Sequence, residues 1–186
     1  MITKKKIIGI CGSASRNSAN LSILKWIKQP LKADFDLEII YDLTELPHFK
    51  TELTDKNVPK QVVDLRQKIE NANGIIICTP EYVFSIPSGL KNMIEWCVST
   101  TVFSDKPTGL ITASASGERG HEELKLIMET VQTKFTDETT LLIQGIKGKI
   151  DKNGKILDTK TETELKKFVQ SFERLTRKPT NHKCFD

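Results

Sequence analysis

A short apolar run at residues 74–78 constrains the fold more than any other feature of this chain. It reads Gly-Ile-Ile-Ile-Cys and has no charged or amide side chain on either face. Such a run is typical of a strand that is buried on both faces of a parallel sheet. Four further strands are predicted at residues 6–11, 36–41, 107–113 and 139–145.

Segments with helical spacing of apolar residues separate these strands. They centre on residues 21–27, closed by Pro30, and on 62–69, 90–98, 124–131 and 165–172. Strands that alternate with helices predict an α/β fold, a three-layer sandwich with a five-stranded parallel sheet in the order 2-1-3-4-5. We expect a single domain over residues 1–176 and a flexible tail over 177–186.

Composition excludes several classes of protein. The 186 residues are 38% hydrophobic and 28% charged, with a formal net charge of +4. These values fit a globular protein with an anionic small ligand, and the scattered charges form no nucleic-acid stripe. No apolar run reaches the roughly 20 residues of a membrane span, and no signal-peptide pattern follows Met1, so we expect a cytoplasmic protein and no membrane partner.

The cysteines show no metal-ligand or redox-pair spacing. Cys11, Cys78, Cys97 and Cys184 form no CxxC pair and have no ligand-like spacing with the histidines. We therefore expect free thiols, buried in the first three cases, and no metal site.

The loop after the first strand, residues 12–20, is rich in donors for an anion. Ser13, Ser15, Ser18, Asn20 and Arg16 lie where the first helix begins. A helix N-terminus presents unpaired N–H groups and favours negative charge, so the loop predicts a phosphate site. The alternative is ordinary helix capping, which needs only one such residue. The loop has neither the GxxxxGK[ST] nor the GxGxxG pattern.

Two further loops should meet the first at the switch point of the sheet. Ligands of such sheets bind outside the carboxyl ends of the strands, where the strand order reverses. The loop at 79–87 carries Tyr82 and Phe84, which suit stacking on a flat ring or, alternatively, cover the start of the next helix. The loop at 114–120 is rich in Ser and Gly, and its N–H groups would suit a developing negative charge.

These motifs together resemble a known family. The first loop, followed by Pro80-Glu81-Tyr82, Pro87, Leu90-Lys91-Asn92 and Glu95-Trp96, is similar to the NAD(P)H-dependent FMN reductases of the flavodoxin-like fold. The resemblance runs from the first strand to about the last helix, and its specific part is residues 80–96. Val83 stands where the family usually has Asn, and Arg16 lies one position later than usual.

The resemblance implies a role for each loop. It assigns the FMN phosphate to the first loop, the isoalloxazine to the second and the pyrimidine side of the ring to the third. The residues implicated are Ser13, Ser15, Arg16, Ser18, Asn20, Pro80, Glu81, Tyr82, Val83, Ser114, Ser116 and Gly117. The cofactors would be FMN and NAD(P)H, with hydride passing from the nicotinamide to the flavin and electrons then to a small-molecule acceptor. We nominate no catalytic acid or base.

Other features allow more than one interpretation. Arg119 is either a contact for the nicotinamide nucleotide or a surface arginine, and residues 151–154 predict a hairpin turn. Trp96 lies off the apolar stripe of its helix, which indicates either a subunit interface or packing under a neighbouring loop. The resemblance implies a homodimer or homotetramer.

Two other functions remain open at this point. One is a flavodoxin-like electron carrier that docks on protein partners, and the other is a non-catalytic α/β interaction protein. The identity of the acceptor and the choice between NADH and NADPH do not follow from the sequence.

Overall fold

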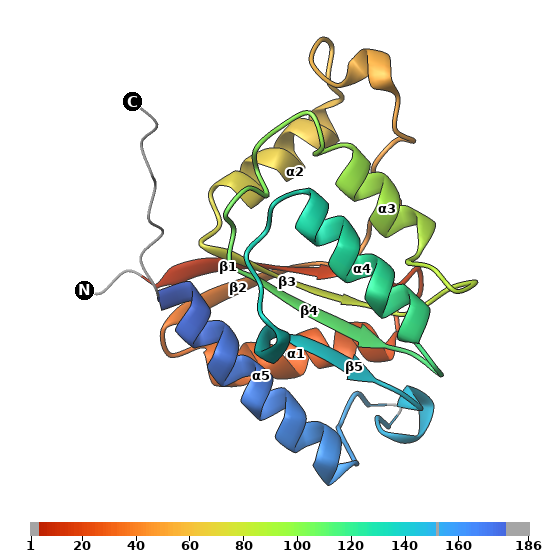
Figure 1. Cartoon of the computed structure of the whole chain (residues 1–186), viewed down its shortest axis with the longest axis vertical. Helices are drawn as coiled ribbons and strands as arrows, with labels where there is room; N and C mark the ends of the chain where they lie inside the picture. Colours follow the sequence, from red (N-terminus) through yellow and green to blue (C-terminus); the bar gives the residue numbers. More distant parts are fainter. Residues whose placement is uncertain (1–3, 152, 178–186) are drawn as a thin grey trace.

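The structure is a computed structural model that describes residues 4–151 and 153–177. Five parallel strands form one sheet in the order β2-β1-β3-β4-β5, as predicted. Helices α1 and α5 cover one face, and α2, α3 and α4 cover the other (Figure 1). In chain order the elements are β1 (Lys5–Cys11), α1 (Ala19–Leu31), β2 (Phe35–Ile40), η1 (Thr51–Leu53), α2 (Lys60–Glu70), β3 (Gly74–Thr79), α3 (Ser88–Glu95), β4 (Thr108–Ala113), α4 (Glu118–Thr130), η2 (Asp137–Thr139), β5 (Thr140–Ile143), η3 (Ile146–Gly148) and α5 (Thr159–Arg177).

The central strand β3 is buried along its whole length. Ile76 and Cys78 pack in the core under α1 and α5, whereas Ile75 and Ile77 pack in the core under α2, α3 and α4. Both faces of the strand are therefore dry, which explains why residues 74–78 carry no charged or amide side chain.

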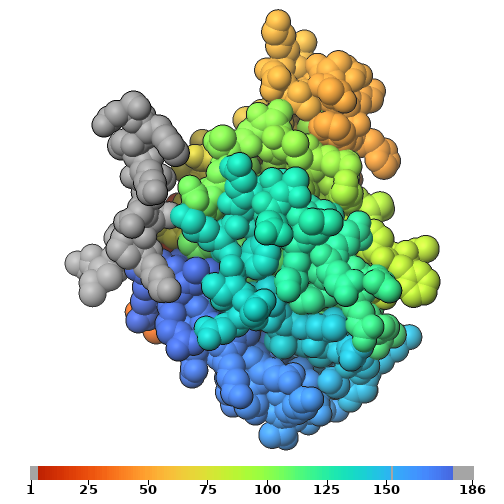
Figure 2. All heavy atoms as spheres, viewed as in Figure 1, coloured from red at the N-terminus to blue at the C-terminus, as the bar shows by residue number. Residues whose placement is uncertain are grey.

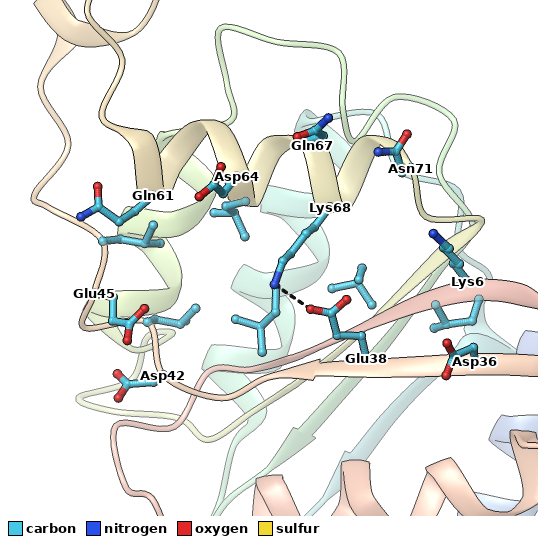
Figure 3. A pocket seen from close by; sticks show the side chains of 16 residues that line it. Lys6, Asp36, Glu38, Asp42, Glu45, Gln61, Asp64, Gln67, Lys68 and Asn71 are labelled. Carbon is cyan, nitrogen blue, oxygen red and sulfur yellow. Dashed lines mark hydrogen bonds and ion pairs between the residues drawn. The ribbon is translucent and has the colours of Figure 1, made fainter.

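The edge strand β2 has only one buried face. Phe35 and Leu37 pack under α1, while Asp36 and Glu38 point to the opposite face, beside α2. A groove of about 630 Å³ lies on this side, and Lys68 Nζ lies 2.7 Å from Glu38 Oε1 within it. Figure 3 shows the side chains that line this groove. Charged side chains on an exposed edge disfavour pairing with the edge of another chain.

The segment between β2 and α2, residues 41–59, is held more tightly than its polar sequence indicates. Its far part, with η1, projects at the top of Figures 1 and 2. Its near part is hydrogen-bonded to α3, because the carbonyl of Pro47 accepts from Trp96 Nε1 at 2.7 Å. Trp96 is 0% exposed, so its assignment to a subunit interface is wrong and the alternative, packing under a loop, is confirmed. The helical stripe could not show this, since the covering loop lies about fifty residues earlier in the chain.

Element ends differ slightly from expectation. α1 continues one residue beyond Pro30, and α3 ends at Glu95 rather than extending to residue 98. The hairpin at 151–154 is confirmed by the antiparallel bridge between Ile150 and Ile156. α5 continues through residue 177, and the rest of the expected tail, 178–186, lies outside the described residues. None of the helices among the described residues is long and apolar enough to cross a membrane.

Candidate functional site

Three loops meet at the carboxyl ends of β1, β3 and β4, as the strand order requires. The strands are in register there, with Cys11 beside Cys78 and Thr79 beside Thr112. β1 leads to α1 on one face of the sheet and β3 leads to α3 on the other, so the crevice between their loops is the switch point.

Gly12 allows the first and second loops to approach closely. Its N–H donates to the carbonyl of Cys78 at 2.9 Å. A Cβ at this position would lie 2.3 Å from Thr79 Oγ1, well inside van der Waals contact. Only glycine fits between the two strand ends without a shift of the backbone.

The first loop presents hydroxyls and one guanidinium around the start of α1. Ser18 caps the helix, with its Oγ accepting from Leu21 N at 3.1 Å, and Ser13 Oγ accepts from Ser15 N at 3.2 Å. Ser15 is exposed, and the side chain of Arg16 is 84% exposed. Within the described part of the chain, the guanidinium of Arg16 pairs with the carboxylate of Asp42 at 3.6 Å. The loop can therefore both cap the helix and bind an anion. Ser18 is used as the cap, whereas Ser13 bonds within the loop and Ser15 faces solvent.

The side-chain amide of Asn20 is already hydrogen-bonded to other parts of the protein. It is 3% exposed, its Nδ2 donates to the carbonyl of Ala113 at 3.2 Å, and its Oδ1 accepts from the Cys78 thiol at 3.3 Å. The side chain thus ties α1 to β3 and β4 beneath the site. A direct contact with phosphate stays a prediction for this residue.

The second loop is a tight, strained turn. Tyr82 and Ser85 exchange backbone hydrogen bonds of 2.8 and 3.0 Å, and Val83 and Phe84 between them have φ of +52° and +60°. Left-handed backbone is costly for a β-branched residue. Val83 is 93% exposed and Phe84 is 76% exposed, and the segment 80–86 projects as the yellow-green tip at the right of Figure 2. Strain and exposed apolar surface at one place are typical of a functional loop.

Glu81 joins the second loop to the third. Its carboxylate accepts from Gly120 N at 2.8 Å and from Gly117 N at 3.3 Å, so it occupies the N-terminus of α4. Glu123 reinforces the connection by accepting from Ile86 N at 2.9 Å. These bonds change one expectation, because two of the N–H groups expected to face a developing negative charge already point to a carboxylate of the protein.

The third loop is shaped by Gly117 and His121. Gly117 has φ of +88°, and a Cβ there would lie 3.0 Å from Leu142 Cδ1. Nδ1 of His121 lies 2.9 Å from Thr112 Oγ1, and burial lowers the pKa of the imidazole, so it is neutral at neutral pH. Ser114 is half-buried and Ser116 is exposed. Arg119 is exposed and pairs with Glu122 at 3.1 Å, which is the surface alternative considered above.

The described thiols are buried, as expected. Burial raises the pKa of Cys11, of Cys78 and of Cys97, the last to about 12. Such thiols are poor nucleophiles at neutral pH. Cys184 lies outside the described residues.

A cavity of about 770 Å³ opens beside the first loop. Ser13, Arg16 and Tyr82 are the predicted site residues that line it. Gly12 and Ala14 of the first loop also line it, and α3 contributes Lys91, Asn92 and Glu95. The part that was missed from the sequence is the segment after β2, which contributes Tyr41, Asp42, Leu46, His48 and Phe49. The motif contained Lys91, Asn92 and Glu95, but no pattern in the sequence indicated the segment after β2 that completes the lining.

The donor set fits FMN. A phosphate would meet the exposed Ser15 and Arg16 at the N-terminus of α1, a 13-residue helix whose dipole favours an anion. A flat ring would meet the rigid turn around Tyr82 and the glycine-lined start of α4. The close approach at Gly12 brings these two parts of the site together.

Comparison with known proteins decides the family. Residues 5–147 match the profile of the NADPH-dependent FMN reductases. The chain belongs to this family. The resemblance seen in the sequence is confirmed, and with it FMN and NAD(P)H as cofactors and oxidoreductase as the class of enzyme.

Individual relatives cover nearly the whole chain. A NADH:(hydroxy)cinnamate reductase subunit, CrdA, from Vibrio ruber is 29% identical over 91% of this chain and 86% of its own length. An NAD(P)H:quinone oxidoreductase from Solanum tuberosum is 28% identical, with 93% of each chain covered. Among solved structures, the flavoenzyme NAD(P)H:(acceptor) oxidoreductase FerB from Paracoccus denitrificans superposes with a TM-score of 0.79 at 24% identity, over 92% of this chain and 97% of that one. The last likeness supports the flavodoxin-like fold.

Proposed function

We propose that this FMN reductase passes electrons to a planar, quinone-like acceptor, with its flavin held at the junction of the three loops. The observation that carries the proposal is the pairing of a phosphate-sized donor loop at the start of α1 with the adjoining, rigid turn at 80–86. The 770 Å³ cavity beside them is large enough for an aromatic ring system.

Each loop has a separate task. Ser13, Ser15, Arg16 and Ser18 would hold the phosphate, with Asn20 fixing the start of α1 from below. Pro80, Glu81, Tyr82 and Val83 would face the ring on one side. Ser114, Ser116 and Gly117 would flank its pyrimidine end.

The chain's own residues act mainly by position and charge. Bound FMN supplies the hydride acceptor and electron donor chemistry. Arg16 would offset the charge of the phosphate, and Glu81 keeps the second and third loops at a fixed separation. His121, neutral and bonded to Thr112, supports β4 and does not supply a positive charge at neutral pH. A shared binding face for both substrates predicts ping-pong kinetics.

The acceptor is proposed from the relatives and the lining of the cavity. The Solanum tuberosum relative is named for quinones and the Vibrio ruber relative for (hydroxy)cinnamate, both planar conjugated compounds. Tyr41, Phe49 and Tyr82 line the cavity here and suit a planar ring.

An electron carrier that docks on a protein partner is the second candidate. The name of the Vibrio ruber relative makes it one subunit of a reductase. The exposed apolar tip at Val83 and Phe84 offers this chain a surface for such docking. Rapid reduction of a free quinone by the purified chain with NAD(P)H alone favours the enzyme over the carrier. The homodimer or homotetramer and the cytoplasmic location stay predictions.

Flavin titration tests the proposal. Purified protein should quench FMN fluorescence on binding, and NADH or NADPH should bleach the bound flavin without oxygen, with recovery on adding a quinone. Arg16→Ala should raise the Kd for FMN about tenfold, since a charge-assisted contact to phosphate is lost. Arg119→Ala, which removes another exposed and paired arginine, is the matched control and should leave the Kd unchanged. Wild-type protein that binds no FMN under any condition would refute the assignment.

A further inference from the structure

We propose that Trp96 and Asn92 are positioning residues for the acceptor. They hold residues 46–49, here called the 46–49 wall, against α3 and thereby set the width of the 770 Å³ cavity. The inference rests on the proposed function, because it concerns the acceptor of the same site. It explains why the motif contains Asn92 and Trp96, since both side chains donate to the carbonyl of Pro47.

Three hydrogen bonds fasten the wall. The carbonyl of Pro47 accepts from Trp96 Nε1 at 2.7 Å and from Asn92 Nδ2 at 3.1 Å. Asn92 Oδ1 in turn accepts from Phe49 N at 2.7 Å. Both ends of the amide are used, so the Asn92 side chain has one defined orientation. The ring of Phe49 also meets the indole edge-on, with centroids 5.3 Å apart at 79°.

The far end of the same segment is fastened through the same tryptophan. Arg66 on α2 donates from Nε to the carbonyl of Trp96 at 2.8 Å and from a terminal nitrogen to the carbonyl of Thr54 at 2.9 Å. Trp96 thus joins α2, α3 and the segment after β2. The indole itself is 0% exposed and lies behind the wall, so it acts on the cavity only through Pro47 and Phe49.

The wall faces the cavity with an apolar and aromatic surface. Leu46, His48 and Phe49 line the cavity from this side, with Tyr41 next to them. Of the Lys and Arg side chains in the lining, Lys91 pairs with Glu95 at 2.8 Å, and Arg16 is the residue that the proposed function assigns to the FMN phosphate. A neutral planar ring therefore suits this compartment better than the diphosphate of a dinucleotide.

Kinetics with two quinones of different size test the proposal. Trp96→Phe keeps an aromatic ring but removes the N–H that bonds Pro47. The KM for menadione, a two-ring quinone, should rise about tenfold, the change that loss of one buried hydrogen bond corresponds to. The KM for one-ring benzoquinone should rise less than threefold. The kcat, the KM for NADH and the Kd for FMN should stay within about twofold.

Controls separate positioning from folding. Trp26→Phe changes the chain's other tryptophan, on α1 at the opposite face of the sheet, and should change no kinetic constant. Asn92→Leu removes the amide without touching the indole, and should shift the ratio of the two KM values in the same direction. This second variant keeps the test informative if Trp96→Phe does not fold. Because Asn92 also lines the cavity, the buried Trp96 is the residue whose variant tests positioning without a direct contact.

A spectroscopic measurement needs no turnover. In the Trp26→Phe protein, Trp96 is the remaining tryptophan, and its emission should be quenched saturably by menadione. The emission of Trp26 in the Trp96→Phe protein should show no saturable change. Equal rises in both quinone KM values, a parallel loss of FMN affinity, or no change at all would overturn the inference. Failure of the wild-type chain to bind FMN would instead overturn the proposed function.

Discussion

The carboxylate of Glu81 should contribute measurably to the stability of the site, and Glu81→Gln tests this. The carboxylate accepts from Gly120 N at 2.8 Å and Gly117 N at 3.3 Å, at the positive end of α4. Each hydrogen bond to a charged group is worth about 1.5–3 kcal/mol, and the helix dipole adds about 0.3–1 kcal/mol. The 3.3 Å bond lies at the weak end of that range. Because Gln keeps one acceptor oxygen but loses the charge, we expect a loss of about 2 kcal/mol in the free energy of unfolding.

Urea and thermal unfolding measure this loss. For a domain of this size about 2 kcal/mol lowers the Tm by roughly 4–8 °C. Glu122→Gln is the matched control, since Glu122 lies in the first turns of the same helix, 68% exposed, and pairs only with Arg119 among the described residues. It should cost less than about 0.5 kcal/mol. If wild type and Glu81→Gln have equal free energies of unfolding, the carboxylate does not fix the third loop. In that case the Kd for FMN should also be the same for the two proteins.

Three further predictions follow from the loops. Val83→Asn should stabilise the protein by about 0.5–1 kcal/mol in urea unfolding, since Asn tolerates the φ of +52° at this exposed position; a loss of stability would contradict the strain. Gly12→Ala should cost about 2–3 kcal/mol and weaken FMN binding, because its Cβ would lie 2.3 Å from Thr79 Oγ1; a Tm equal to that of wild type would count against the close approach. Burial lowers the pKa of His121 below its usual 6.5, so the folded state binds a proton less readily than the unfolded state. Stability should accordingly be level above pH 6.5 and fall as the pH drops below it, and His121→Gln should flatten this slope in a Tm series from pH 8 to pH 5.

Local patterns were sufficient to predict the sheet. Each strand is an apolar or alternating run whose neighbours in the sequence are helices, so the fold follows from short windows of sequence. β2 was expected at 36–41 and lies at Phe35–Ile40, a shift of one residue in the edge strand. The apolar stripe of α3 was placed correctly, with Leu90, Met93 and Ile94 buried.

Contacts between distant parts of the chain could not be predicted in this way. Trp96 lies off the stripe of its helix because it packs against Pro47 and Phe49, and no periodicity links two segments so far apart. The bonds from Glu81 to the start of α4 cross thirty-six and thirty-nine positions. The resemblance placed Glu81 near the isoalloxazine ring, but it did not indicate that the carboxylate accepts from the backbone of Gly117 and Gly120.

The turn at Val83 was missed for a different reason. A β-branched residue is among the least expected in left-handed backbone, so residue type argued against the conformation that the structure shows. Hydrogen bonds between Tyr82 and Ser85 hold the turn despite this local preference. Here two backbone hydrogen bonds across the turn outweigh the propensity of one side chain.

The strand order β2-β1-β3-β4-β5 also bears on how the chain can fold as it is synthesised. β1 emerges first, β2 adds on one side of it, and β3, β4 and β5 then add in turn on the other side. Each new strand therefore pairs at an open edge, and none has to insert between two strands already joined. The βαβ unit that ends at β2 is complete after residue 40 has emerged, and each later unit buries its helix on a strand that is already in place. A nascent chain of this topology can thus build its sheet in the order of translation, with the flavin loops closing only when β4 has joined.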